Sequence, residues 1–251
     1  QKYVDTWRGV IDHINANARE IDGEMKWPNA YGDYFGEEDW YDWKDQPFSS
    51  GAKEVWYWSM NPDDAKRVAN DPWVQYLQGD NPDYPTKALE ASLGRVRTDM
   101  ARMAADTCSP DTRLSDDMNS INPAKIDALN QLMLGGLPTG RVGSPLYCHV
   151  RYFDPEKRRA GIPEDVAALV EHISADEVTL TLVNVNPVVS RSVVVQGGAY
   201  AEHEIVKAYL GEQEIVVSNS ACTVKLEPGC GAQLKLTLKR FANQPTLAFP
   251  W

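Results

Sequence analysis

The hydrophobic period of this 251-residue chain changes once, close to residue 140. Before that point apolar residues recur in steps of three and four, as at Val4, Trp7 and Ile11. After it they alternate with polar residues, as at Val178 and Leu180. The first period predicts amphipathic helices and the second predicts strands that bury one face. The sequence therefore predicts an α+β, multidomain chain, with a helical region over residues 1–139 and a β region over residues 140–251.

Four segments of the first region have helical features. Apolar steps predict helices over residues 3–21 and 86–106, and residues 51–60 are expected to form two or three turns. Residues 122–136 resemble a complete short helix, with Asn122 as its cap, Pro123 in its first turn and two glycines at its end. The segment between the first two helices has no sustained period. We therefore expect only helix and loop before about residue 137.

The second region is predicted to be an antiparallel β-sandwich. Its alternating runs are short, and turns containing Asn-Pro, Gly-Gly, Leu-Gly and Pro-Gly separate them. No crossover helices intervene, which favours antiparallel pairing over a parallel sheet. One run, residues 164–174, is expected to form a helical turn instead. Glycine and proline residues between 136 and 145 mark the boundary between the two regions.

Charge narrows the classes of partner. The formal net charge is -11, and residues 1–139 account for most of it, with 14 Lys/Arg against 24 Asp/Glu. Nucleic acid and anionic membranes are excluded as expected partners because this surface would repel them. A membrane-spanning helix is not expected either, since no apolar run approaches the roughly 18 residues required. Cys222 and Cys230 are close enough in sequence to form a small disulfide, although four cysteines leave the pairing open.

The sequence contains no motif for a cofactor or a metal. It has no phosphate-binding loop, no dinucleotide-binding glycine pattern, no nucleophile elbow and no zinc-binding helix. Calcium binding is an alternative for residues 33–39 and 111–119, but neither segment matches the twelve-residue calcium loop. In AEHEI, a strand would place Glu202 and Glu204 on one face and His203 on the other, so these three cannot converge on one ion, and the other histidines are expected to be structural or exposed. We therefore predict neither cofactor nor metal.

Residues 178–205 and 224–251 resemble the terminal β-sandwich of large bacterial proteins, mostly of unassigned function, in which a helical region precedes the sandwich. A helical region followed by a sandwich with a Leu-x-Pro-Gly turn also resembles carbohydrate-active enzymes built as an (α/α) toroid plus sandwich. That resemblance implies a glycoside hydrolase or polysaccharide lyase that is exported or at the cell surface. The resemblance does not assign a catalytic residue of those enzymes to any position of this sequence. The chain opens at Gln1 without an initiator Met, so we expect the C-terminal part of such an enzyme, with its N-terminal remainder as a partner.

The strongest candidate site is the aromatic-acidic stretch, residues 31–43. Eleven of the 24 aromatic residues lie between residues 27 and 58. Flat aromatic faces can stack on sugar rings, while carboxylates bond hydroxyl groups or supply acid and base across a glycosidic bond. Two alternatives stay open: the aromatic residues fill a core, or the chain is a non-catalytic glycan-binding or subunit-interface module. The predicted catalytic residues are Asp33, Glu37 and Glu38, and the predicted ligand-binding residues are Tyr31, Tyr34, Trp40, Tyr41, Asp42 and Trp43.

Overall fold

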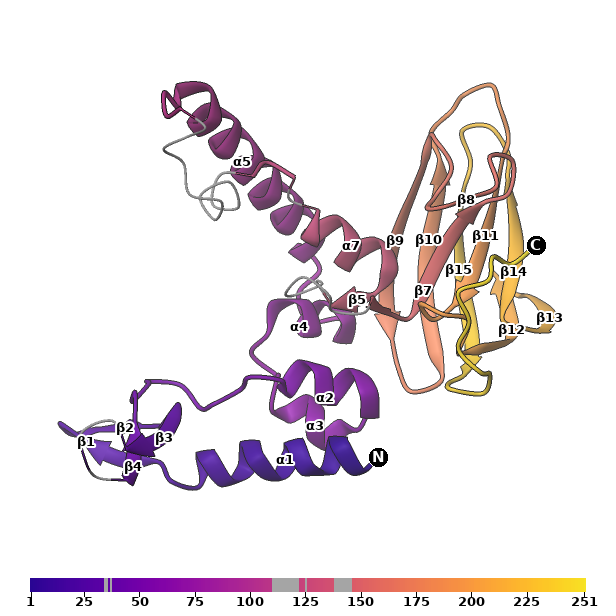
Figure 1. Ribbon diagram of the computed structural model, residues 1–251. Helices are drawn as coiled ribbons and strands as arrows, with labels where there is room; N and C mark the ends of the chain where they lie inside the picture. The colour runs from indigo at the N-terminus through magenta and orange to yellow at the C-terminus, as the bar shows by residue number, and fades with distance from the viewer. Residues whose placement is uncertain (34–35, 37, 110–121, 125, 138–145) are drawn as a thin grey trace. The chain divides into compact units, whose positions relative to one another are not determined.

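The computed structural model describes residues 1–33, 36, 38–109, 122–124, 126–137 and 146–251. The chain forms two compact units, Gln1–Val74 and Gln75–Trp251, which we call unit 1 and unit 2. Among the described residues, unit 1 contains three helices and two small hairpins, one short helix spans the boundary, and unit 2 contains two further helices and the large antiparallel sheets (Figure 1). The expected order of helices first and antiparallel strands second is therefore confirmed.

Unit 1 is built on α1 (Lys2–Asn15), α2 (Ala52–Ser59) and α3 (Pro62–Lys66). These helices, together with the start of α4 (Pro72–Gln78), enclose a small core in which the Trp73 indole donates a 2.6 Å hydrogen bond to the Tyr57 hydroxyl. Asn61 caps α3 by accepting a hydrogen bond from the Asp63 amide, and Pro62 occupies the first turn. The predicted helix over residues 51–60 is confirmed.

Two hairpins correct the expectation of only helix and loop before residue 137. The first pairs β1 (Arg19–Ile21) with β2 (Glu24–Lys26), and the second pairs β3 (Ala30–Asp33) with β4 (Glu38–Tyr41). Asp22 and Gly23 both have positive φ, the geometry of a type I′ turn and of the Asp-Gly pair that favours it. Consequently α1 ends at Asn15 rather than near residue 21.

After the end of α4, unit 2 continues with the 22-residue helix α5 (Tyr84–Ala105), which confirms the predicted helix there. Helix α7 (Asp127–Leu134) contacts α5 and begins five residues after the predicted cap. Asn122 accepts a hydrogen bond from the Ala124 amide, so it forms a local turn before the helix. Gly135 ends α7 with a φ of 56° and lies against Val170 and Ile173, where a side chain would collide.

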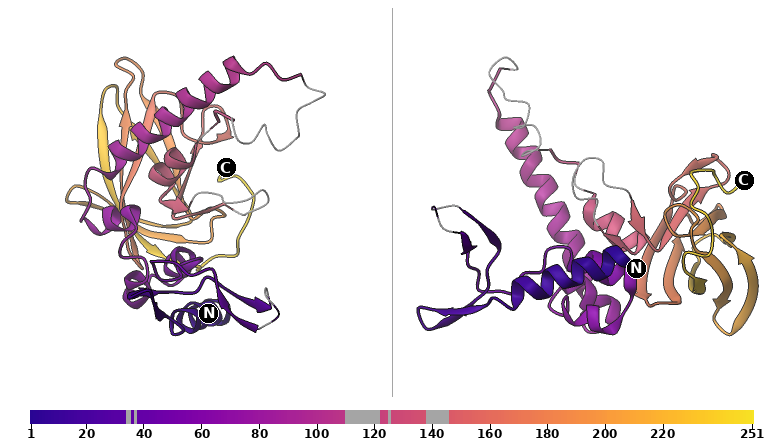
Figure 2. Two further views of the ribbon diagram at one scale, coloured as in Figure 1. Left: turned by 90° about the vertical axis from the view of Figure 1, so that its left-hand side faces the viewer. Right: turned by 60° about the horizontal axis from the view of Figure 1, so that its bottom comes forward.

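The β region is a two-layer sandwich (Figures 1 and 2). One sheet has the order β13-β12-β15-β10-β9 and the other has the order β14-β11-β7-β8. All pairs are antiparallel, and a separate two-stranded ribbon joins β5 to β6. The strands are β5 (Gly136–Leu137), β6 (Tyr147–Cys148), β7 (Val150–Asp154), β8 (Arg159–Ala160), β9 (Val166–Ile173), β10 (Glu177–Asn184), β11 (Arg191–Gly197), β12 (Glu204–Leu210), β13 (Gln213–Asn219), β14 (Ala221–Leu226) and β15 (Gly231–Lys239).

Apolar side chains from both sheets fill the space between the layers. Val178 and Leu180 of β10 lie opposite Leu236 and Leu234 of β15, and all four are buried. Val195 of β11 belongs to the facing sheet and is equally buried. The predicted alternation along these strands is therefore confirmed, and burial of these apolar faces stabilises the sandwich.

One further expectation, and one possibility that the sequence left open, are decided in unit 2. Residues 166–173 form strand β9 at the edge of the larger sheet, not a helical turn. Cys222 and Cys230 are both free, so the small disulfide is absent. Across the described ranges, no helix is long and apolar enough to cross a membrane.

Candidate functional site

The candidate site begins with the hairpin of β3 and β4. Tyr31 lies opposite Trp40, and their ring centroids are 5.0 Å apart in an edge-to-face arrangement with an interplanar angle of 66°. Such a cross-strand aromatic pair stabilises a short hairpin that could not persist on backbone pairing alone. Tyr31 is 55 % exposed despite this contact. Its ring therefore remains accessible to a ligand.

Asp33 and Glu38 form the next pair on the same face of this hairpin, two residues beyond Tyr31 and Trp40. Side chains two residues apart on a strand share a face, so these carboxylates lie on the face that carries Tyr31 and Trp40. Both carboxylates are exposed. The structure thus brings together two of the three predicted catalytic residues and two of the predicted aromatic residues. Glu37 and Tyr34, which were also predicted, lie outside the described residues.

A groove of about 550 Å³ separates this aromatic pair from helix α1. We call it the α1–hairpin groove. Trp7, Val10 and His13 of α1 line one side, and Tyr31 and Trp40 line the other. The His13 and Trp40 rings are 5.8 Å apart. Helical periodicity alone does not show which face of α1 meets the hairpin, so the α1 wall could not be predicted from the sequence.

The three remaining predicted ligand-binding residues lie elsewhere. Tyr41 belongs to the opposite face of the hairpin, where its ring lies beside Gly32, close to the position that a Cβ would take there. The Arg19 guanidinium covers Trp43 at 4.1 Å from the ring centroid. Asp42 accepts hydrogen bonds from Asn29 at 2.8 Å and from Lys44 at 2.7 Å, which lower its pKa. None of these three residues lines the α1–hairpin groove.

A buried carboxylate fixes α1 against α2 and α3. Asp64 is 1 % exposed and accepts hydrogen bonds from Arg8 at 2.5 and 2.7 Å, from Ser59 at 2.5 Å and from Arg67 at 3.0 Å. Burial raises the pKa of Asp64, but the hydrogen bonds from Arg8 and Ser59 outweigh this effect and leave the pKa below its usual value. Arg8 comes from the middle of α1, so this network also positions the α1 wall of the groove.

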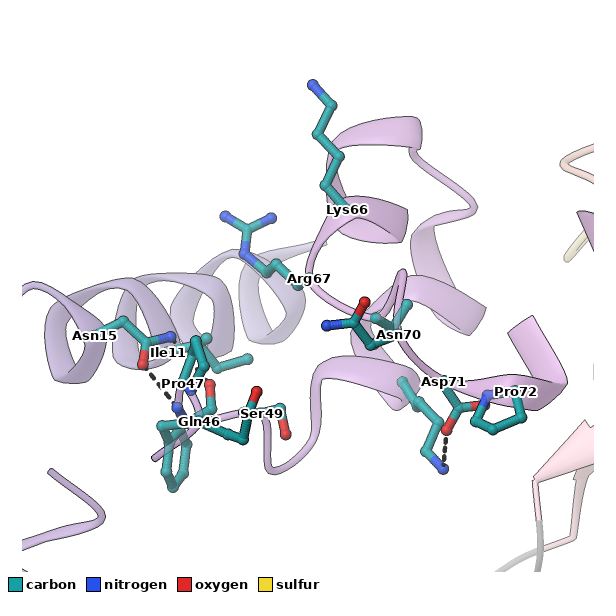
Figure 3. Close-up of a pocket in the computed structure, with 13 residues that line it drawn as sticks. Ile11, Asn15, Gln46, Pro47, Ser49, Lys66, Arg67, Asn70, Asp71 and Pro72 are labelled. Atoms are coloured by element: carbon teal, nitrogen blue, oxygen red, sulfur yellow. Dashed lines mark hydrogen bonds and ion pairs between the residues drawn. The ribbon is translucent and has the colours of Figure 1, made fainter. Parts of the chain in front are cut away.

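A second, more polar pocket of about 540 Å³ lies among α1, residues 46–49 and residues 66–72 (Figure 3). Asn15 holds its floor by bonding both backbone groups of Phe48, and Figure 3 shows the Lys66 side chain directed away from this loop. Its cations are neutralised, because Lys53 pairs with Asp71, Lys66 pairs with Asp63, and Arg67 pairs with Asp12 and Asp64. Anion binding is therefore not favoured there.

Three buried polar residues of unit 2 bond backbone groups of the same unit. His149 is fully enclosed and directs Nδ1 at the Gly135 carbonyl, and burial lowers the pKa of His149 to about 3. His203 accepts a hydrogen bond from the Phe241 amide, and burial lowers its pKa as well. The Asn184 amide bonds three carbonyl groups, those of Val189, Leu226 and Glu227. These contacts indicate structural roles.

The calcium alternative concerns two segments, residues 33–39 and residues 111–119. Among the described residues, no group of three or more His, Cys, Asp or Glu side chains is arranged to hold a metal ion. The other segment weighed for calcium, residues 111–119, lies outside the described residues.

Comparisons with known proteins give one match. A family model described as "Domain of unknown function (DUF8034)" matches residues 69–130, which include α4 and α5. No curated protein and no solved structure matches the chain. The family match covers about a quarter of the sequence and none of the α1–hairpin groove.

Proposed function

We propose that the α1–hairpin groove binds a glycan. The observation that carries this proposal is the Tyr31–Trp40 pair, which presents accessible aromatic surface to a groove of about 550 Å³. Binding sites for small molecules combine apolar and aromatic walls with a few polar groups that fix orientation. Asn29 and His13 supply such polar groups within the groove. Sugar rings match this combination because they have apolar C–H faces and hydroxyl edges.

The proposal extends to the setting of the groove. We propose that the chain is the C-terminal part of an exported carbohydrate-active protein, whose helices form part of an (α/α) toroid and whose N-terminal remainder completes the binding surface. The order of helices followed by an antiparallel sandwich supports this layout.

Glycoside hydrolysis by Asp33 and Glu38 is the second candidate function. These residues are directly opposite in the hairpin register, and such pairs have Cβ atoms about 4.5–5.5 Å apart. Retaining glycosidases hold their two carboxyl groups about 5–5.5 Å apart, so the pair is close enough for a nucleophile and an acid. Asp33→Asn and Glu38→Gln would each abolish hydrolysis of a bound oligosaccharide without abolishing its binding.

Binding can be tested by titrating the chain with a panel of oligosaccharides in a calorimeter. We expect Tyr31→Ala and Trp40→Ala each to weaken binding by roughly five- to tenfold, since an aromatic contact contributes about 1–1.4 kcal/mol. Tyr41→Ala is the matched control, because Tyr41 lies on the opposite face of the same hairpin. The proposal fails if no glycan binds, or if Tyr41→Ala weakens binding as much as Tyr31→Ala.

A further inference from the structure

Helix α1 borders a second groove, of about 580 Å³, on its side toward α2. We call it the α1–α2 groove. Its aromatic residues are Tyr3, Trp7 and Trp58, and Val55 and Glu54 complete its wall. Tyr3 is 87 % exposed and Trp58 is 49 % exposed. A cluster of large aromatic side chains with this much accessible surface is typical of a ligand-binding surface.

The two grooves meet at Trp7, which lines both of them. Tyr3, Trp7, Val10 and Ile14 follow one another in steps of four, three and four, so they lie along one face of α1. At a rise of about 1.5 Å per residue, this face extends about 16 Å along the helix. A surface of that length is several times longer than one sugar ring.

Trp7 is fixed in position at the junction. Its indole N–H donates a 3.1 Å hydrogen bond to the Ser50 carbonyl. Its ring also lies so close to Gly51 that a Cβ there would come within 2.0 Å of the indole nitrogen. Preorganised rings lose little conformational freedom on binding, which is why such platforms bind efficiently.

Charge distinguishes between classes of glycan. Residues 1–74 contain 8 Lys/Arg and 15 Asp/Glu, a net charge of −7. Among the described residues that line the two grooves there is no Lys or Arg, and Glu54 carries the only carboxylate. A polyanionic chain of uronic acids would be repelled by this surface and would find no cation to pair with.

We propose that the two grooves form one binding surface for an extended, neutral oligosaccharide, with contacts at Trp58 and Tyr3, at Trp7, and at the Tyr31–Trp40 pair. This inference rests on the proposed function and adds the ligand class. It excludes uronic acid glycans, the substrates on which an eliminating lyase would act, and it predicts that affinity depends on chain length.

The test uses calorimetry on the full chain with neutral cello-, malto-, xylo- and manno-oligosaccharides of two to six units, and with oligogalacturonates of the same lengths. We expect affinity within one neutral series to rise at least tenfold from the disaccharide to the hexasaccharide. Trp58→Ala should remove this gain and leave disaccharide affinity unchanged. Trp251→Ala, an exposed indole of unit 2, is the matched control and should change neither value.

The outcomes separate this inference from the proposed function. If affinity does not depend on oligosaccharide length, or if Trp58→Ala leaves hexasaccharide binding intact, the proposal of one extended surface is wrong. The proposed function of the α1–hairpin groove still holds in that case if Tyr31→Ala abolishes disaccharide binding. Tighter binding of oligogalacturonates than of every neutral series overturns the assignment to neutral glycans. Absence of binding to any oligosaccharide overturns both proposals.

Discussion

Replacing Asp64 by Asn would test how the α1 wall of the groove is held. The side chain keeps its size but loses the charge that joins Arg8 to Arg67 within unit 1. Hydrogen bonds to a charged group contribute about 1.5–3 kcal/mol each, and breaking a buried ion pair costs about 3–5 kcal/mol. The two guanidinium groups are 20 % and 25 % exposed and can partly resolvate. We therefore expect unit 1 to lose about 2–3 kcal/mol.

Tryptophan fluorescence is a selective assay for this effect, because seven of the eight tryptophans lie in residues 1–74. For a unit of this size, about 1 kcal/mol shifts the melting temperature by roughly 4–8 °C, so Asp64→Asn should lower it by about 10–20 °C. Asp63→Asn is the matched control, since the neighbouring Asp63 is exposed and pairs with Lys66 at the surface. Equal melting temperatures for the two variants would refute the reasoning.

The same variant has a pH signature. The pKa of Asp64 is lower in the folded protein than in the unfolded chain, so its stabilising effect is present above the unfolded value of about 3.9. That stabilisation is lost as the pH falls through the folded pKa. The difference between Asp64→Asn and the unaltered protein should be full at pH 7 and should shrink below about pH 4. A difference that grows as the solution is acidified would contradict this assignment.

Three further predictions concern single positions. Gly51→Ala should destabilise unit 1 more than Gly23→Ala in a thermal melt, because both residues have positive φ but only Gly51 faces a ring. Cys108 and Cys230 should react rapidly with a thiol reagent while the other two thiols react slowly, and an intact mass showing a disulfide would contradict the structure. Because burial lowers the pKa of His149 from 6.5 to about 3, unit 2 should lose stability as the pH falls through that window, and His149→Gln should reduce the slope in acid denaturation.

Periodicity predicted the long elements and failed on short or irregular ones. Strands of three or four residues such as β3 and β4 are too short to establish a period, so the hairpin that carries Tyr31 and Trp40 was expected to be a loop. The Asp22-Gly23 pair was a local signal for the first hairpin that the sequence analysis did not use.

Strand β9 shows a different reason for error. Its buried residues Val166, Val170 and Ile173 are spaced four and three apart, which is a helical spacing. The strand has an irregularity in its pairing, where Val170 and His172 oppose successive residues of β10 and Glu171 is skipped. This bulge shifts the inward-facing phase by one residue. A bulged strand therefore produces the same apolar spacing as a helix turn, and sequence alone does not separate the two.

The candidate site was predicted as one continuous stretch of sequence, residues 31–43. Only some of its described residues line the α1–hairpin groove. Tyr31 and Trp40 were identified from composition, but strand alternation places Tyr41 on the other face of the hairpin. The contribution of Trp7 and His13 depends on tertiary packing of α1 against a hairpin that begins 17 or more residues later in the chain. No local sequence pattern predicts that α1 packs against the hairpin of β3 and β4.

The two edges of the larger sheet differ in their vulnerability to self-association. Helix α7 packs against β9 at one edge, whereas β13 at the other edge pairs only with β12 among the described strands. Ile215 and Val216 of β13 are 45 % and 68 % exposed. An accessible edge strand with apolar side chains is a template for adding strands from another copy. We therefore expect intermolecular β-pairing under partly denaturing conditions to begin at β13.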